Sequence, residues 1–180
     1  MLYLASQSPR RRQLLEQIGV RFAILDVEVP EVRDPSETPE AYVGRVARAK
    51  ATAGMACLGA DSDAVVLAGD TEVVLGDEVF GKPVDAAHAT AMLRRLAGRR
   101  HRVLSAVCCV GGQAATAAMN ESIVEFASLS EERIAAYVAS GEAFGRAAEP
   151  WEVADVIVFL ASGYSSYMTG EIVSVSSQHP

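Results

Sequence analysis

Residues 1–19 read MLYLASQSPRRRQLLEQIG, and this stretch predicts a buried β-strand that leads directly into an α-helix. The apolar run after Met1 is typical of a buried strand. Ser6 or Ser8 suits the N-cap of the helix, and Pro9 suits its first turn. We expect the helix to end at Gly19. Its predicted apolar face consists of Leu14, Leu15 and Ile18.

The start of this predicted helix carries three consecutive arginines, Arg10, Arg11 and Arg12. A helix N-terminus already has partial positive charge, so cations are disfavoured there unless something compensates them. Its free N–H groups bind anions, and arginine binds phosphate in a bidentate manner. Together with Ser6 and Ser8, the arginines indicate a phosphate site. Taken alone, the arginines are also compatible with a solvated face on a surface helix.

The rest of the chain predicts strands and helices that mix without strict alternation. We expect a strand at 21–29, two paired strands around the Gly111–Gly112 turn, and a strand at 64–83 that has a polar interruption and a hairpin at Gly76–Asp77. Periodic apolar residues and capping signals predict helices at 39–56, 85–98 and 130–141. The fold class is therefore α/β, or α+β, with a mixed twisted sheet flanked by helices.

The length, net charge and cysteine content of the chain limit the classes of function that are expected. The chain has 180 residues, half of them hydrophobic, and a formal net charge of -7, which suits a globular domain and disfavours nonspecific binding to nucleic acid or an anionic membrane. The three cysteines, Cys57, Cys108 and Cys109, show no metal-binding spacing. We expect reduced, buried thiols in a cytoplasmic protein, because no signal peptide or membrane span is visible.

Three further polar clusters lie at the ends of predicted elements. Asp70 and Thr71 interrupt an apolar strand, and a carboxylate in such a place needs a partner such as a metal ion or a water molecule to be activated. A hydrogen-bonded turn would also explain them. Lys82, between Gly81 and Pro83, is a candidate phosphate ligand or an ordinary turn residue. Glu31 and Lys50, taken separately, look like surface charges.

Five segments follow one another along the chain: LASQSPRRRQLLEQIG, PEAYVGRVARAKA, AGDTEVVLGDEVFGKP, AMLRRLAGRRHRVLSAV and SLSEERIAAYVASGE. In their order and spacing they resemble the Maf family of nucleoside triphosphate pyrophosphatases. The resemblance covers about residues 1–145 and implies a Maf/ITPase-like fold.

The resemblance implies hydrolysis of a nucleoside triphosphate to the monophosphate and pyrophosphate. It implies that Asp70 and Glu31 hold a divalent cation, Mg²⁺ or Mn²⁺, and that Asp70 activates water. Lys82 joins them as a catalytic candidate. The residues expected to bind the substrate are Ser6, Ser8, Arg10, Arg11, Lys50 and Thr71.

At Arg10 and Thr71 the chain resembles the family branch that acts on dTTP and UTP. The branch that acts on 7-methyl-GTP has tryptophan in place of Arg10 and glutamine in place of Thr71. The family often has threonine where this chain has Ser105. A homodimer and a role in removing modified nucleotides are expectations at the level of the family.

Residues 146–180 depart from the family pattern near Gly145. They resemble instead the C-terminal end of short-chain dehydrogenase/reductases, through EPWEVADVIVFLAS and SSYMTGE. The chain has neither the Gly-rich turn nor the Tyr-x-x-x-Lys motif of those enzymes, so an oxidoreductase is not expected. We expect a Maf-like domain at 1–145 followed by an atypical helix–strand tail that is not an independent domain. Because the family's base-recognition glutamine has no counterpart here, a non-catalytic nucleotide-binding or interaction protein is the alternative.

Overall fold

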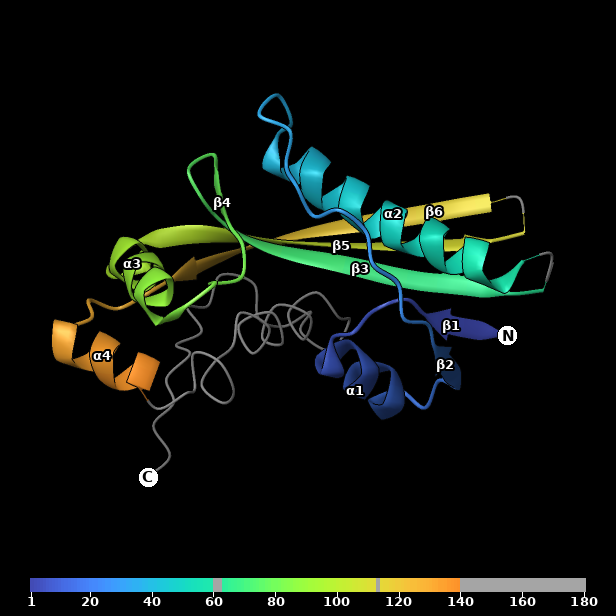
Figure 1. Ribbon diagram of the computed structural model, residues 1–180, viewed down its shortest axis with the longest axis horizontal. Coiled ribbons are helices and arrows are strands. Elements are labelled where there is room, and N and C mark those ends of the chain that lie inside the picture. Colours follow the sequence, from blue (N-terminus) through green and yellow to red (C-terminus); the bar gives the residue numbers. More distant parts are fainter. Residues whose placement is uncertain (60–62, 113, 140–180) are drawn as a thin grey trace, which may run out of the picture. The chain divides into compact units, whose positions relative to one another are not determined.

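The computed structural model describes residues 1–59, 63–112 and 114–139 of the chain. In Figure 1 these residues form a mixed six-stranded sheet with helices, which is the fold class predicted from the sequence. The strands are β1 (Leu2–Leu4), β2 (Phe22–Ile24), β3 (Val65–Leu75), β4 (Glu78–Phe80), β5 (Arg100–Gly111) and β6 (Ala114–Glu125). The helices are α1 (Pro9–Gln17), α2 (Pro39–Leu58), α3 (Ala86–Leu96) and α4 (Glu131–Ala139).

The register of β1 with its neighbours decides where polar residues meet. The strand order is β2-β1-β3-β5-β6, and β4 pairs with β3. β1 is parallel to both β2 and β3, with Leu4 opposite Ile24 and Leu67. The parallel ladder continues for one more residue, because the Ala5 N–H donates to the Leu67 carbonyl at 2.8 Å. β3 extends beyond the end of β1, so Asp70 lies level with the turn into α1, at the edge where open α/β sheets bind ligands.

The contacts divide the chain into two compact units. The first contains Met1–Thr71 and Leu104–Asn120, and the second contains Glu72–Val103 and the described residues from Glu121.

Close packing of α2 on the sheet organises the first unit. The helix begins after Thr38, whose side chain accepts a hydrogen bond from the Ala41 N–H, and it has Pro39 in its first turn. At Gly54 a Cβ atom would lie only 2.8 Å from Val66 Cγ1 and 3.0 Å from Ala5 Cβ. Glycine at this position therefore allows the helix to approach β1 and β3 closely. As predicted, the buried face of α2 includes Tyr42, Val43, Val46 and Ala47.

The second unit contains α3 packed beside α4 (Figure 1). Asp85 caps α3 by accepting from the His88 N–H, and Ser130 caps α4 by accepting from the Arg133 N–H. Val103 is fully buried against Val73 and Val124. The neighbouring His101 is also buried.

Several local predictions were wrong. β3 continues through Asp70 and Thr71 without the expected interruption. The strand predicted at 21–29 is limited to Phe22–Ile24. No residue of α1 is buried, and Ile18, which was expected on its apolar face, is 65% exposed. Cys108 is buried as expected, but Cys57 is exposed. None of the helices in the described part of the chain combines the length and apolar character needed to cross a bilayer.

Candidate active site

The first unit brings together polar residues from five separate segments. They come from the turn after β1, from α1, from the segment that follows β2, from α2, and from β3. Among the described residues they form two bonded groups, one of Lys50 with Glu31 and Asp70, and one of Arg11 with Ser6 and Thr71. The charges of Arg11 and Asp70 also act on each other, which relates the two groups electrostatically.

Lys50 joins the two carboxylates of its group. Its Nζ atom lies 2.8 Å from Asp70 Oδ1 and 2.6 Å from Glu31 Oε1. The Lys50 side chain is only 14% exposed, whereas that of Glu31 is 42% exposed. Local sequence alone suggested that Glu31 and Lys50 are separate surface charges, whereas the family resemblance placed both in the site; in the structure they form an ion pair. The Asp70 Oδ2 atom is buried and has no hydrogen-bond partner among the described residues.

Hydroxyl groups orient the guanidinium of Arg11. Arg11 Nη1 donates to Ser6 Oγ at 3.1 Å, and Nη2 donates to Thr71 Oγ1 at 3.2 Å. Thr71 Oγ1 lies in turn 3.1 Å from Ser105 Oγ. Ser6 Oγ also accepts from the Ser8 N–H at 3.2 Å. Arg11 is therefore held from two sides by groups that carry no charge, and it makes no direct ion pair with another described residue.

Burial and the neighbouring charges of opposite sign shift the pKa values of Asp70 and Arg11 in opposite directions. Burial raises the pKa of Asp70, and the negative charge of Glu31 raises it further, whereas Lys50 and Arg11 lower it. Arg11 is only half-buried by its exposed area, but desolvation still lowers its pKa, whereas the carboxylates of Asp70 and Glu31 raise it. Arginine stays protonated in proteins, so a fixed cation faces a carboxylate whose affinity for a proton is higher than usual.

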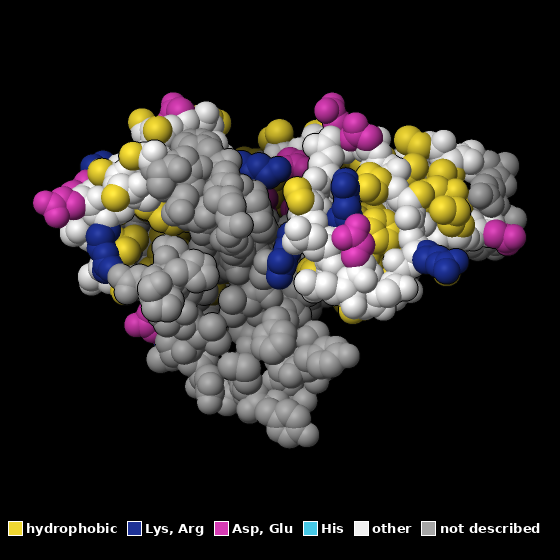
Figure 2. Space-filling view, turned by 90° about the horizontal axis from the view of Figure 1, so that it is seen from below, with side chains coloured by type: hydrophobic (Ala, Val, Ile, Leu, Met, Phe, Trp, Pro, Cys, Tyr) yellow, Lys and Arg dark blue, Asp and Glu magenta, His cyan; other side chains and the backbone are white. Residues whose placement is uncertain are grey.

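The other predicted site residues are less tightly held. Ser8 occupies the expected N-cap position of α1, but its side chain makes no capping hydrogen bond. Arg10 Nη1 donates to Gln13 Oε1 at 3.2 Å. Lys82 is exposed and belongs to the second compact unit. On the face shown in Figure 2, the described Lys and Arg side chains are dispersed among acidic, hydrophobic and other side chains.

The residues present fit a divalent cation of the kind that binds together with a polyphosphate. Within the described residues no group of three or more His, Cys, Asp or Glu could hold a metal ion. Mg²⁺ needs fewer protein ligands, because one or two carboxylates suffice when water and substrate phosphates complete the coordination. Asp70, whose Oδ2 atom has no partner among the described residues, and Glu31, which shares Lys50 with it, carry oxygen atoms of the hard type that such a cation prefers.

Ser105 is a member of the hydroxyl chain that the sequence-based site prediction did not include. It lies on β5, and its hydroxyl group shares a hydrogen bond with that of Thr71. A signal was present in the sequence, since Ser105 is a polar residue inside the apolar run VLSAV. That signal alone did not say which face of the strand the hydroxyl occupies or what it meets.

Comparison with known proteins identifies the family to which the chain is similar. The model of the family described as Maf-like protein matches residues 1–149. A dTTP/UTP pyrophosphatase of Xanthomonas campestris pv. campestris is 53% identical over 173 residues, covering 93% of this chain and 91% of that protein. A nucleoside triphosphate pyrophosphatase of Xylella fastidiosa is 51% identical over 148 residues, covering 82% of this chain and 78% of that protein.

Similarity to solved structures is weaker. The Staphylococcus aureus Ham1 protein has a TM-score of 0.46 and 16% identity, covering 69% of this chain and 70% of that one.

The predicted reductase-like tail lies outside the described residues and stays a prediction. The family match spans most of the chain and includes every residue of the site described above. The chain belongs to the family of Maf-like proteins.

Proposed function

We propose that the chain hydrolyses dTTP and UTP between the α and β phosphates, giving the nucleoside monophosphate and pyrophosphate. Relatives with more than half of their aligned residues identical carry the name dTTP/UTP pyrophosphatase. The structural observation that carries the proposal is the buried Asp70, whose Oδ2 atom has no partner among the described residues although two cationic side chains lie close by.

Asp70 suits the role of general base. A carboxylate whose pKa is raised by burial binds a proton more strongly than an exposed one, so it removes a proton from water more readily. Lys50 Nζ, 2.8 Å from Oδ1, favours the ionised form that a base requires. In this proposal the Asp70 carboxylate accepts the proton of the attacking water while its Oδ1 atom stays paired with Lys50.

The cationic side chains suit the triphosphate. Arg11 is presented in a fixed orientation by Ser6 and Thr71, which favours bidentate binding of phosphate oxygens. Lys50 stabilises negative charge next to the base. We assign Arg10 and Lys82 to the leaving pyrophosphate by family resemblance. Positive charge fixed in advance at the position where the leaving group becomes more negative lowers the barrier to cleavage.

A divalent cation held by Asp70 and Glu31 would supply further positive charge to the phosphate oxygens. Glu31 contributes the second carboxylate, and Lys50 prevents the two carboxylates from repelling each other when no cation is bound. The two carboxylates are thus kept close together before the substrate arrives.

Product analysis tests the proposed reaction. The full chain is incubated with UTP and Mg²⁺, and nucleotides and phosphates are separated by chromatography. The proposal predicts UMP and pyrophosphate in equal amounts. UDP with inorganic phosphate would mean cleavage at the γ-phosphate and would contradict it. Binding of UTP without any product, measured by calorimetry, would instead support the alternative of a nucleotide-binding protein without catalysis.

A further inference from the structure

Glu31 has to be held in place by something other than regular secondary structure. It lies between β2 and α2, in a segment that is neither helix nor strand. Its side chain is 42% exposed, yet its Oε1 atom is 2.6 Å from Lys50 Nζ. Segments of this kind ordinarily sample many conformations, and ordering them when a ligand binds reduces affinity. Strong binding of a cation by Glu31 therefore requires an anchor.

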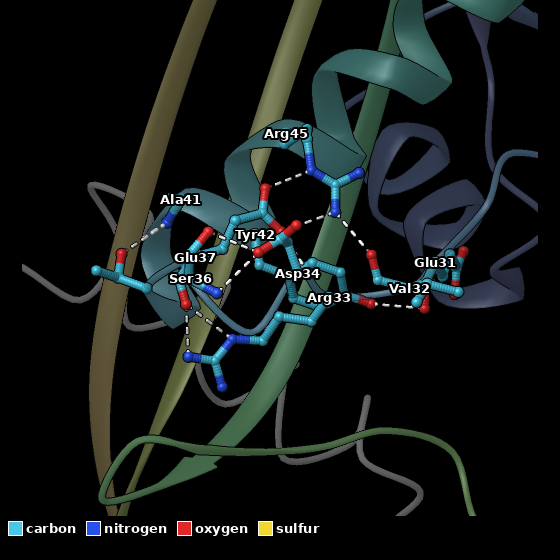
Figure 3. A network of polar contacts seen from close by, with 10 residues as sticks. Glu31, Val32, Arg33, Asp34, Ser36, Glu37, Ala41, Tyr42 and Arg45 are labelled. Atoms are coloured by element: carbon cyan, nitrogen blue, oxygen red, sulfur yellow. Dashed lines mark hydrogen bonds and ion pairs between the residues drawn. The ribbon is translucent and has the colours of Figure 1, made fainter.

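We propose that Tyr42 and Arg45 are positioning residues that fix Glu31 for the binding of a divalent cation; this inference rests on the proposed pyrophosphatase function. Both residues belong to α2, the helix that also carries Lys50. Figure 3 shows them facing the segment that contains Glu31. One rigid helix thus determines the position of Glu31 and of the lysine with which it pairs.

Tyr42 holds the backbone of Glu31 itself. Its hydroxyl group donates to the Glu31 carbonyl oxygen at 2.9 Å. The Tyr42 side chain is only 4% exposed, so the ring has little freedom and the hydroxyl group is well placed. Tyr42 and Lys50 are eight positions apart on one helix, which puts them on nearly the same face, about two turns from each other. The Glu31 backbone is bound at one of these turns and its carboxylate at the other.

Arg45 holds the residues that follow Glu31. Its Nη2 atom donates to the Val32 carbonyl oxygen at 2.9 Å. Its Nε and Nη2 atoms bind the Glu37 carboxylate at 2.5 and 2.9 Å, which is a bidentate pair. Arg33 folds back onto the same place, with its Nε atom donating to the Glu37 carbonyl oxygen at 3.0 Å. Residues 31–37 are therefore tied to the helix near both ends (Figure 3).

If Tyr42 and Arg45 act by positioning Glu31, the effect of changing either of them should depend on the Glu31 carboxylate. The hydrogen bonds that carry this proposal run from Tyr42 and Arg45 to residues 31–37, so in the proposal both residues act on the cation through the position of Glu31. Loosening the segment should therefore weaken cation binding and leave the other phosphate-binding residues in place. Once the Glu31 carboxylate has been removed, the same change should have almost no further effect.

A double-mutant cycle with Tyr42→Phe and Glu31→Gln tests this coupling in the full chain. Pyrophosphate release from UTP is measured as a function of Mg²⁺ concentration. We expect Tyr42→Phe to raise the half-saturating Mg²⁺ concentration about three- to tenfold, the range typical for loss of one hydrogen bond. In the Glu31→Gln background it should cause no further increase. Tyr3→Phe is the control, because no hydrogen bond of the Tyr3 hydroxyl to the described residues is present.

Arg45 offers an independent comparison. Arg45→Gln should raise the half-saturating Mg²⁺ concentration as Tyr42→Phe does. Arg45→Lys should restore it only in part, because an ammonium group cannot bind a carbonyl and a carboxylate with the same planar fork. Arg48→Gln changes an exposed arginine of the same helix and should have no effect.

Cation binding is also measured without turnover. Mn²⁺ is titrated into each variant in the presence of α,β-methylene-UTP and followed by electron paramagnetic resonance. The proposal predicts weaker Mn²⁺ binding by Tyr42→Phe and Arg45→Gln than by the unaltered chain. Equal Mn²⁺ binding, or a Tyr42→Phe effect that persists in full with Glu31→Gln, would overturn the positioning role alone. An unaltered chain that releases no pyrophosphate would overturn the proposed function, and the inference with it.

Discussion

At the scale of single residues, the candidate site is a balance of charges around Asp70. Its carboxylate is buried, which disfavours ionisation, and it shares Lys50 with Glu31. Each neighbour shifts the equilibrium in a known direction, because Glu31 raises the pKa of Asp70 and Lys50 lowers it. The net effect raises the pKa of Asp70, so its carboxylate is more basic than that of an exposed aspartate, and this direction favours general base catalysis.

The pH dependence of kcat/KM should report this balance. A base works only when ionised, so activity falls as the pH drops through the pKa of Asp70. Because that pKa is raised, the fall should begin above the ordinary aspartate value of about 3.9. Glu31→Gln should move this acidic limb to lower pH, and Lys50→Met should move it to higher pH. A limb that stays in place in both variants would show that another group titrates.

Local sequence predicted some residues of the candidate site and missed others. Arg11, Asp70 and Thr71 were singled out because their charge or polarity conflicts with their surroundings in the sequence. Lys50 looked like an ordinary helix charge, because its partners Glu31 and Asp70 are 19 and 20 positions away. Ser105 was overlooked for the same reason, since its partner Thr71 lies on a different strand. Family resemblance supplied Glu31 and Lys50, whereas local pattern did not.

At the scale of elements, α2 has two functions. One face is buried against the sheet and includes Val43 and Val46, both fully buried. Tyr42 and Lys50 combine burial with polar contacts to Glu31. The helix was predicted at 39–56 and observed at Pro39–Leu58, because its capping residue, its first-turn proline and its apolar periodicity all agree. The interruption predicted in β3 was wrong because Asp70 and Thr71 find polar partners on other elements.

Val46→Ala should test the contribution of the buried helix face. Removing two methyl groups from a fully buried position leaves a cavity and should lower the free energy of unfolding by about 2 kcal/mol. The exposed Val84 provides the control, and Val84→Ala should change stability by no more than about 0.5 kcal/mol. Urea unfolding followed by circular dichroism measures both. Equal effects at the two positions would contradict the assignment of Val46 to the core.

His101 on β5 should make the fold sensitive to acid. Its ring is buried edge-on against Phe126, with ring centroids 4.7 Å apart, and burial lowers its pKa. The unfolded chain therefore takes up a proton near pH 6.5 while the folded chain does not. The free energy of unfolding is unaffected by this group above that pH and falls as the pH drops below it.

The His101→Leu variant isolates this effect. Urea unfolding between pH 5 and pH 8 should show a shallower loss of stability on the acidic side than in the unaltered chain. The exposed Val84 is the comparison, and Val84→Ala, which changes no titratable group, should retain the original slope. Identical slopes for the unaltered chain and His101→Leu would mean that other groups cause the sensitivity to acid.

At the scale of the whole molecule, the site depends on long-range contacts within the first compact unit. Asp70 and Lys50 meet because α2 lies close to β3 at Gly54, where a larger residue would press against Val66. No local pattern in the sequence predicts that approach. The mixed sheet and nearly all of its helices were predictable from periodicity and capping signals. The division at residue 145 stays a prediction, although the family match ends nearby, at residue 149.

The central claim is that Asp70 is the base of a cation-dependent pyrophosphatase. The most direct test measures pyrophosphate release from UTP and dTTP by the full chain, with and without Mg²⁺, for Asp70→Asn and for the control Glu28→Gln. We predict that release requires Mg²⁺, is abolished in Asp70→Asn without a loss of thermal stability, and is unchanged in Glu28→Gln. Undiminished release by a folded Asp70→Asn variant would contradict the account.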